Sequence, residues 1–139
     1  MNEARKRHII FVDDDENVGQ ALRRMLRPMR NQWEMAFSTS GQDALEQMAH
    51  SPFDIIVSDM HMPTMHGADL LAKVMELYPE TIRFALSGSP GSDTVIRTAA
   101  IVHQFLVNPV EPTLLLHIFT RAFALRGQLE KSGVRNLLI

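Results

Sequence analysis

The stretch Phe53-Asp54-Ile55-Ile56-Val57-Ser58-Asp59-Met60-His61-Met62-Pro63 decides the fold of this chain. Its apolar run is short, contains β-branched residues and stops at a carboxylate that is soon followed by a proline. A run of this kind, bounded by turn signals, indicates a strand buried on both faces, as in a parallel sheet covered by helices. We therefore expect a strand over residues 54–58, with Asp59 at the point where the chain leaves the core.

Segments of similar character recur along the rest of the chain. Further strands are predicted over residues 8–12, 33–37, 81–86 and 104–107. Apolar residues at helical spacing predict helices from residue 16 to near Pro28 and over residues 42–50, 93–101 and 111–125. A further helix is predicted after Gly67, where Leu70, Leu71, Val74 and Leu77 recur at helical spacing before Tyr78-Pro79. Asp15 is the expected N-cap of the first helix. Alternating strands and helices predict an α/β fold, a doubly wound parallel sheet with helices on both faces. The flavodoxin-like strand order 2-1-3-4-5 is the expected topology.

Length and composition limit the classes of protein that fit. The 139 residues suit a single domain over residues 8–126, with tails at 1–7 and 127–139. A net charge of -2 argues against a nucleic-acid-binding face, and the absence of cysteine excludes disulfides and thiolate chemistry. No apolar run approaches the roughly 18 residues that a membrane span needs, and the first residues do not form a signal peptide. We expect a soluble, cytoplasmic domain.

Polar residues stand at the end of four predicted strands. Asp13 and Asp14 follow the first, Asp59 the third, Ser87 the fourth and Asn108 the fifth. In the order 2-1-3-4-5, strands 1 and 3 are neighbours at the switch point, where ligands bind beyond the carboxyl ends. The three carboxylates are therefore expected to converge on one crevice.

Three converging carboxylates predict a particular chemistry. Like charges raise one another's pKa unless a cation is present, and hard oxygen ligands on an open site suit Mg2+. An aspartate beside such a metal can act as a nucleophile and carry an aspartyl-phosphate. The hydroxyl of Ser87 could then donate a hydrogen bond to a phosphoryl oxygen.

Several motifs stand at the ends of the predicted strands. They are Phe11-Val12-Asp13-Asp14, Ile56-Val57-Ser58-Asp59-Met60-His61-Met62-Pro63 with Gly67, Leu86-Ser87-Gly88, and Phe105-Leu106-Val107-Asn108-Pro109. In this order and spacing, they resemble the receiver (CheY-like) domains of two-component response regulators over roughly residues 8–126. The sequences of residues 22–27, 33–37 and 122–128 resemble those of receivers fused to an output domain of the HDOD type, a metal-free relative of HD phosphohydrolases. On that reading the tail after residue 126 is a linker toward an output domain.

The resemblance implies a role for each matching residue. Asp59 matches the phospho-acceptor, which takes a phosphoryl group from a histidine kinase or phosphotransfer protein. Asp13, Asp14, Asp59 and the backbone carbonyl of His61 match the Mg2+ ligands. Only self-phosphorylation and self-dephosphorylation are expected of such a signalling domain, with no turnover of a free substrate.

The resemblance also implies how the domain responds. Ser87 and Phe105 match the residues that switch conformation on phosphorylation, and His61 and Ser89 match positions whose side chains tune dephosphorylation. A homodimer through the face of residues 93–101, 104–107 and 111–125 is the implied assembly. For Phe105, a simple core role remains an equal alternative.

One position departs from the family pattern. The family usually has Lys-Pro after the fifth strand, whereas this chain has Asn108-Pro109. Asn can donate a hydrogen bond but carries no charge, and a charge-assisted bond is about twice as strong as a neutral one. The substitution removes no metal ligand, and the response to phosphorylation is what it is expected to weaken.

Three function classes remain open. The first is a phosphorylated receiver with a kinase partner, and the second is a degenerate receiver that acts as a phosphorylation-independent interaction module, with Asn108 as its signal. The third is a flavodoxin-like enzyme or phosphatase with Asp59 as nucleophile. It is disfavoured because no glycine-rich phosphate loop follows the first strand.

The same residues also have simpler readings. Asp13 and Asp14 could be a solvated acidic turn that caps a helix, but Asp59 across the crevice favours a shared site. His61, His66 and His103 lack the helical i,i+4 spacing of a ligand pair, so we interpret them as loop and surface residues.

Overall fold

The computed structural model describes residues 6–88, 92–107 and 110–132. Two compact units are distinguished, residues 1–108 and 109–139. The first unit holds a five-stranded parallel sheet of β1 (Arg7–Val12), β2 (Trp33–Ser38), β3 (Ile55–Asp59), β4 (Ile82–Ser87) and β5 (Gln104–Val107). The strand order is β2-β1-β3-β4-β5, which confirms the predicted topology.

The central strands are buried on both faces. Ile9 and Ile10 follow one another in β1, so their side chains point to opposite faces of the sheet, and both are completely buried. Ile55 and Ile56 of β3 are likewise completely buried. The short apolar run in the sequence therefore marked a strand covered by other elements on each side, as expected of a parallel sheet.

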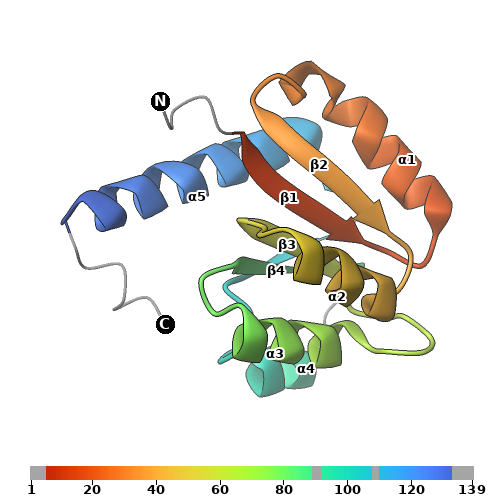
Figure 1. Cartoon of the computed structure of the whole chain (residues 1–139). Helices are drawn as coiled ribbons and strands as arrows, with labels where there is room; N and C mark the ends of the chain where they lie inside the picture. The colour runs from red at the N-terminus through yellow and green to blue at the C-terminus, as the bar shows by residue number, and fades with distance from the viewer. Residues whose placement is uncertain (1–5, 89–91, 108–109, 133–139) are drawn as a thin grey trace. The chain divides into compact units, whose positions relative to one another are not determined.

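Four helices belong to the first unit: α1 (Glu16–Met25), α2 (Gly41–His50), α3 (Gly67–Leu77) and α4 (Ser92–Thr98), with a short 3-10 helix, η2 (Arg27–Met29), after α1. Figure 1 shows α1 beside β2 on one face of the sheet and α2, α3 and α4 gathered on the other. On this second face, Ile10 and Ile56 of the sheet pack with Leu70, Leu71 and Val74 of α3 in one apolar cluster. These layers confirm the doubly wound architecture.

The start of α1 follows the predicted cap. The carboxylate of Asp15 accepts a hydrogen bond from the backbone N–H of Asn17 at 2.9 Å, which satisfies one of the free donors of the first turn. The helix ends at Met25, and Pro28 lies in η2, consistent with a proline close to the helix end. The cap matters to the site because it fixes the chain just after Asp13 and Asp14.

The predicted end of α4 is wrong. The helix was expected over residues 93–101 but ends at Thr98, and the N–H groups of Ile101 and Val102 both donate to the Thr98 carbonyl in a closing turn. The carbonyl of Ile101 instead accepts a hydrogen bond of 2.7 Å from Nε of the buried Arg83 in β4. A tertiary contact with a buried arginine therefore overrides the apolar periodicity.

The second unit contains α5 (Pro112–Ser132). The carboxylate of Glu111 accepts a hydrogen bond of 2.8 Å from the backbone N–H of Leu114, so this side chain caps the first turn. The helix continues past residue 125, the predicted end, into the segment interpreted as a tail. Among the residues that the structure describes, no helix is both long and apolar enough to cross a membrane.

Candidate functional site

Strand register brings the carboxylates together. Val12, the last residue of β1, pairs with Ser58 of β3, so Asp13 and Asp59 are the next residues along two neighbouring strands. Parallel strands place their carboxyl ends on the same edge of the sheet, and Asp14 follows directly in the loop before α1. The convergence predicted from the sequence is therefore confirmed.

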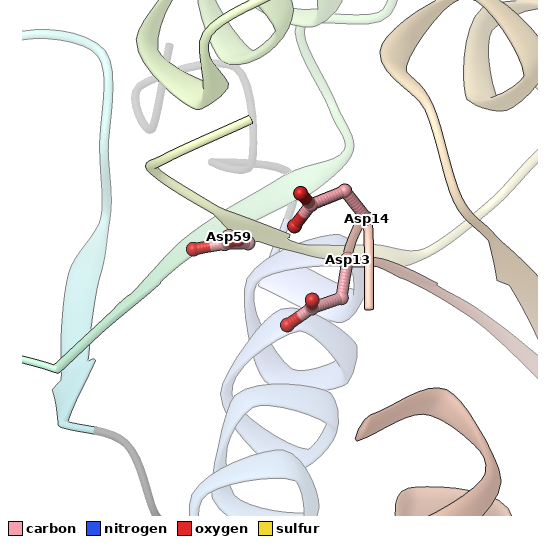
Figure 2. A group of neighbouring side chains, drawn as sticks. All are labelled: Asp13, Asp14 and Asp59. Atoms are coloured by element: carbon pink, nitrogen blue, oxygen red, sulfur yellow. The ribbon is translucent and has the colours of Figure 1, made fainter. Parts of the chain in front are cut away.

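The three carboxylates form one compact cluster. One carboxylate oxygen from each of Asp13, Asp14 and Asp59 can be chosen so that all three lie within 4.8 Å of one another. Figure 2 shows Asp13 and Asp14 at the end of β1 and Asp59 at the end of β3. Asp13 is buried, Asp59 is half-buried and Asp14 is exposed, so the cluster is open to solvent on one side.

Burial makes the charge on Asp13 costly. The pKa of Asp13 is raised from 3.8 to about 6, chiefly by loss of solvent and to a smaller extent by the charges of Asp59, Asp14 and Asp15. The backbone N–H of Asp15, which donates to Asp13 Oδ1 at 2.9 Å, opposes this shift without cancelling it. An ionised Asp13 is thus held in a place that favours a nearby cation.

Asp59 experiences the same two effects. Burial raises the pKa of Asp59 first, and the charge of Asp14 together with a side-chain hydrogen bond to Asp14 raises it further. The backbone N–H of His61 donates to Asp59 Oδ1 at 3.2 Å and lowers the pKa in part. Ionisation of Asp13 and of Asp59 therefore costs free energy when no cation is near.

This donor set fits a hard divalent cation. All three groups offer carboxylate oxygens, and one side of the cluster is open, so water or a ligand oxygen can complete a coordination shell. Mg2+ prefers such sites, with one or two carboxylates and several retained waters. Bringing a cation to the cluster would remove the repulsion that raises the pKa of Asp13 and Asp59.

Ser87 lies beside this edge with an unused hydroxyl. Asp59 pairs with Leu86 in the sheet, so Ser87, the last residue of β4, is one step further along the neighbouring strand. Its side chain is 2% exposed, and its Oγ is the one buried side-chain polar atom without a hydrogen-bond partner in the described part of the chain. A buried hydroxyl without a partner costs stability, and such groups call for a functional explanation.

The loop after Asp59 is tied back onto the site by a glycine. The backbone N–H of Gly67 donates to the Met60 carbonyl at 3.2 Å. A Cβ at residue 67 would overlap the carbonyl oxygen of Asp59 and stand 2.7 Å from the Cα of Met60. The sequence indicated this glycine through its motif, but the reason for it, close approach of two backbones, is visible only in the fold.

The remaining predicted residues divide into three groups. Phe105 of β5 is half-buried and packs against the apolar cluster on the α3 face, which suits a core position. Asn108 and Ser89 lie outside the described residues. His61 and His66 are exposed, and Nδ1 of His103 accepts a hydrogen bond from the Arg83 N–H at 2.9 Å. In the described residues, the histidines join no group that could hold a metal.

Comparison with known proteins gives one consistent match. Residues 9–120 match the model of the response regulator receiver domain family. The chain is 27% identical over 121 residues to the hydrogenase transcriptional regulatory protein HoxA of Cupriavidus necator, covering 86% of this chain and 24% of that protein. It is 28% identical over 132 residues to the response regulator protein PilR of Pseudomonas aeruginosa, covering 94% and 29%. The chain thus spans about a quarter of the length of these relatives.

The similarity to solved structures extends over nearly the whole length of those chains. The signal receiver domain of an HD domain-containing protein from Pseudomonas fluorescens superposes with a TM-score of 0.83 at 27% identity, covering 89% of this chain and 99% of the other. The chemotaxis protein CheY4 of Vibrio cholerae superposes with a TM-score of 0.78 at 25% identity, covering 85% and 99%.

Proposed function

The chain belongs to the response regulator receiver domain family of two-component systems, and from that premise we propose that Asp59 accepts a phosphoryl group from a partner's phosphohistidine. The observation that carries the proposal is the cluster of Asp13, Asp14 and Asp59, whose oxygens lie within 4.8 Å of one another at one sheet edge. Such a cluster can bind a metal beside the one carboxylate that is modified.

Asp59 is the member of the cluster best suited to the transfer. It terminates the central strand β3, it is half-buried, and one of its oxygens is held by the N–H of His61. In the proposed step, the other oxygen attacks phosphorus, the P–N bond to the donor histidine breaks, and an acyl phosphate forms on Asp59. The histidine nitrogen keeps the electron pair of the broken bond, so no oxidant or further reactant is needed.

The proposed metal is Mg2+, held by Asp13, Asp14, Asp59 and the backbone carbonyl of His61. When bound, Mg2+ would neutralise charge on the carboxylates and on the transferring phosphoryl oxygens. The raised pKa of Asp13 and of Asp59 supports this, because both acids would gain from a cation. Asp13 keeps its orientation through the Asp15 N–H.

Ser87 is the proposed reader of the phosphorylated state. Its buried hydroxyl has no partner among the described residues, and a phosphoryl oxygen on the adjacent strand end would accept its hydrogen bond. Phe105 pairs with Ala85 in the register of β4 and β5, two residues before Ser87. A shift of Ser87 would therefore be transmitted through β4 to Phe105 of β5. The homodimer that the family resemblance implies, through residues 93–101, 104–107 and 111–125, is the proposed assembly.

A degenerate receiver is the second candidate function, favoured by Asn108. At this position the family usually has lysine, whose charge would pair with the acidic cluster and then with the phosphoryl group. Asn108 leaves both interactions uncharged. In this alternative the domain binds partners through the same face without being phosphorylated.

The proposed partners are a histidine kinase or phosphotransfer protein and an output domain on the same polypeptide, in the cytoplasm. The matched region is 24% of HoxA and 29% of PilR, which supports a linked output domain. An output domain of the HDOD type is a narrower proposal. It is supported by the sequence of residues 22–27 and by the similarity of this chain to the receiver of an HD domain-containing protein.

Intact-mass measurement separates the two candidates. The chain is incubated with Mg2+ and a small phosphodonor such as acetyl phosphate, beside the Asp59→Ala variant. A phosphorylated receiver gains one phosphoryl group that the variant does not gain. A degenerate receiver stays at its original mass while still binding its partners.

A further inference from the structure

A groove at the β2 edge of the sheet is lined mainly by basic residues. It has a volume of about 430 Å³, and its charged and aromatic lining includes Lys6, Arg23, Arg27, Arg30, Glu34 and Trp33. Four cations against one carboxylate give this wall a surplus of three positive charges. The whole chain has a net charge of -2, so the groove is a local reversal of sign.

Lys6 and Arg30 are held in the groove by backbone carbonyls, and Arg23 is held by an aromatic ring. Nζ of Lys6 donates to the Arg30 carbonyl at 3.0 Å, and Nη1 of Arg30 donates to the Arg27 carbonyl at 3.1 Å. The guanidinium of Arg23 lies 4.3 Å from the centroid of the Phe37 ring. No ion pair joins any of these four side chains to a carboxylate within the described ranges 6–88, 92–107 and 110–132. Their charge therefore remains available to a ligand.

The cations at one end of this groove lie far from the acidic cluster. Lys6 donates to the Arg30 carbonyl and precedes β1, and Trp33 begins β2, so this end of the groove lies at the amino ends of the parallel strands, whereas Asp13 and Asp59 lie at their carboxyl ends. Six residues of β1, each rising about 3.3 Å, separate Lys6 from Asp13 by roughly 20 Å. The lining continues along β2 to Phe37, which pairs with Phe11. A ligand held by Lys6 and Arg30 would therefore lie away from the proposed phosphorylation site.

The aromatic residues of the groove leave no ring face for a nucleobase. Trp33 is 4% exposed, and the Phe37 ring is covered by Arg23 and stacks on Phe11 with a centroid separation of 5.2 Å. Single-stranded nucleic acids bind largely by stacking bases on open aromatic faces. A long polyanion would also meet the negative charge of the rest of the chain.

A protein segment matches the charges better. Carboxylates pair with arginine in a bidentate geometry, which three arginines in one wall can offer. The exposed Glu34 in the same wall would attract a lysine or arginine, which a peptide contains and a phosphate polymer does not. We propose that this groove is a docking site for an acidic segment of a partner protein, with Lys6, Arg27 and Arg30 as its principal contacts. The proposal does not depend on phosphorylation of Asp59.

Peptide titration tests the proposal with a built-in reporter. Trp33 is the single tryptophan of the chain, so its fluorescence reports on the groove. The probe is a short synthetic peptide of glutamate and alanine with one lysine. Saturable binding that weakens with added salt is expected, since exposed ion pairs are screened beyond about 10 Å at 0.1 M salt. Arg27→Glu, an exposed position, is expected to weaken binding roughly tenfold.

A matched control separates site from overall charge. Lys73→Glu makes the same charge reversal at an exposed position of α3 outside the groove and is expected to leave the affinity unchanged. Circular dichroism checks that both variants are folded. If one variant is unfolded, the salt dependence of binding by the wild-type chain still tests the proposal. Equal losses in both variants, or binding of the wild-type chain that salt does not weaken, would overturn the proposal. Tighter binding of a single-stranded oligonucleotide or of inorganic polyphosphate, with the same dependence on Arg27, would overturn it as well.

Discussion

A Cβ on Gly67 would overlap the backbone carbonyl oxygen of Asp59. The first residue of α3 thus touches the backbone of the proposed phospho-acceptor, and its N–H holds the next residue by donating to the Met60 carbonyl at 3.2 Å. The atoms opposite are backbone atoms, which cannot swing aside as the end of a long side chain can. Glycine at this position therefore sets how closely α3 approaches the site.

Gly67→Ala is expected to destabilise the protein and to weaken metal binding together. The added methyl group must displace α3 or the end of β3, and overpacking of this kind costs about 1–3 kcal/mol. Urea unfolding measures the free energy of unfolding, and a Mg2+ titration of the folded protein measures the metal affinity. Full wild-type stability in this variant would show that the close approach is not a constraint.

Gly19→Ala is the matched control for that substitution. Gly19 lies inside α1, and a Cβ there would meet the Phe37 ring at 3.6 Å, an ordinary contact distance. Alanine is the better helix former by about 0.5–1 kcal/mol, so this variant is expected to be as stable as the wild type or more stable. Its Mg2+ affinity is expected to be unchanged.

The raised pKa of Asp13 predicts the pH dependence of stability. Between pH 3.8 and about 6 the folded state holds a proton on Asp13 that the unfolded state has lost, so the free energy of unfolding falls as pH rises through this window. The loss contributed by Asp13 amounts to up to about 3 kcal/mol and is nearly complete about one pH unit above the folded-state pKa. Asp59 acts in the same direction because its pKa is also raised.

Asp13→Asn isolates this contribution. The amide oxygen of Asn can still accept the Asp15 N–H, while the buried charge is removed. Without metal, the variant is expected to exceed the wild type in stability at pH 7 and to match it near pH 4, as measured by thermal unfolding across pH. Saturating Mg2+ should reverse the order at pH 7, since only the wild-type chain keeps all three carboxylates. A constant difference across pH would refute the assignment.

Two buried serines make a contrasting pair. Ser87 Oγ has no hydrogen-bond partner within the described residues, whereas the Ser58 hydroxyl donates to the Asp59 carbonyl at 3.0 Å. Ser87→Ala is expected to leave the unphosphorylated protein as stable as before, or about 1 kcal/mol more stable, because an unsatisfied buried hydroxyl is lost. Ser58→Ala is expected to cost about 1 kcal/mol. Chemical denaturation of both variants checks this, and a clear loss of stability in Ser87→Ala would show that its hydroxyl has a partner.

Asn108→Lys tests whether the missing lysine charge at this position weakens the response to phosphorylation. A lysine would add a charge-assisted bond to a phosphoryl group on Asp59, so the phosphorylated state is expected to gain dimerisation that the wild-type chain shows weakly or not at all. Sedimentation of both proteins with and without a phosphodonor measures this. Asn108→Gln serves as the uncharged control. If lysine and glutamine behave alike, the charge of the side chain is not what matters.

Sequence reasoning predicted the sheet and the acidic cluster because both follow from local signals. The buried strands appear as short β-branched runs, and the strand order then places Asp13 and Asp59 on neighbouring strands. Neither inference needs a side-chain contact. The same holds for Asp15, whose capping role depends on residues within one turn of it.

Features that depend on tertiary contacts could not be predicted in this way. The early end of α4 involves Arg83, which lies 18 residues from the Ile101 carbonyl that it binds. Arg83 is buried in a segment that was interpreted as an apolar strand. The basic groove brings together Lys6, the arginines at positions 23, 27 and 30, and residues of β2. The net charge of the whole chain is -2 and gives no indication of this local basic surface.

The central claim is that the cluster directs phosphorylation to Asp59 and to no other residue. The most direct test is to phosphorylate the chain with acetyl phosphate and Mg2+, reduce the acyl phosphate with borohydride, and map the product by peptide mass spectrometry. Reduction converts a phosphorylated aspartate to homoserine and leaves free carboxylates unchanged. We predict homoserine at residue 59 alone, and none when Mg2+ is removed by a chelator. Homoserine at residue 13 or 14, or at no residue in the presence of Mg2+, would contradict the proposed function.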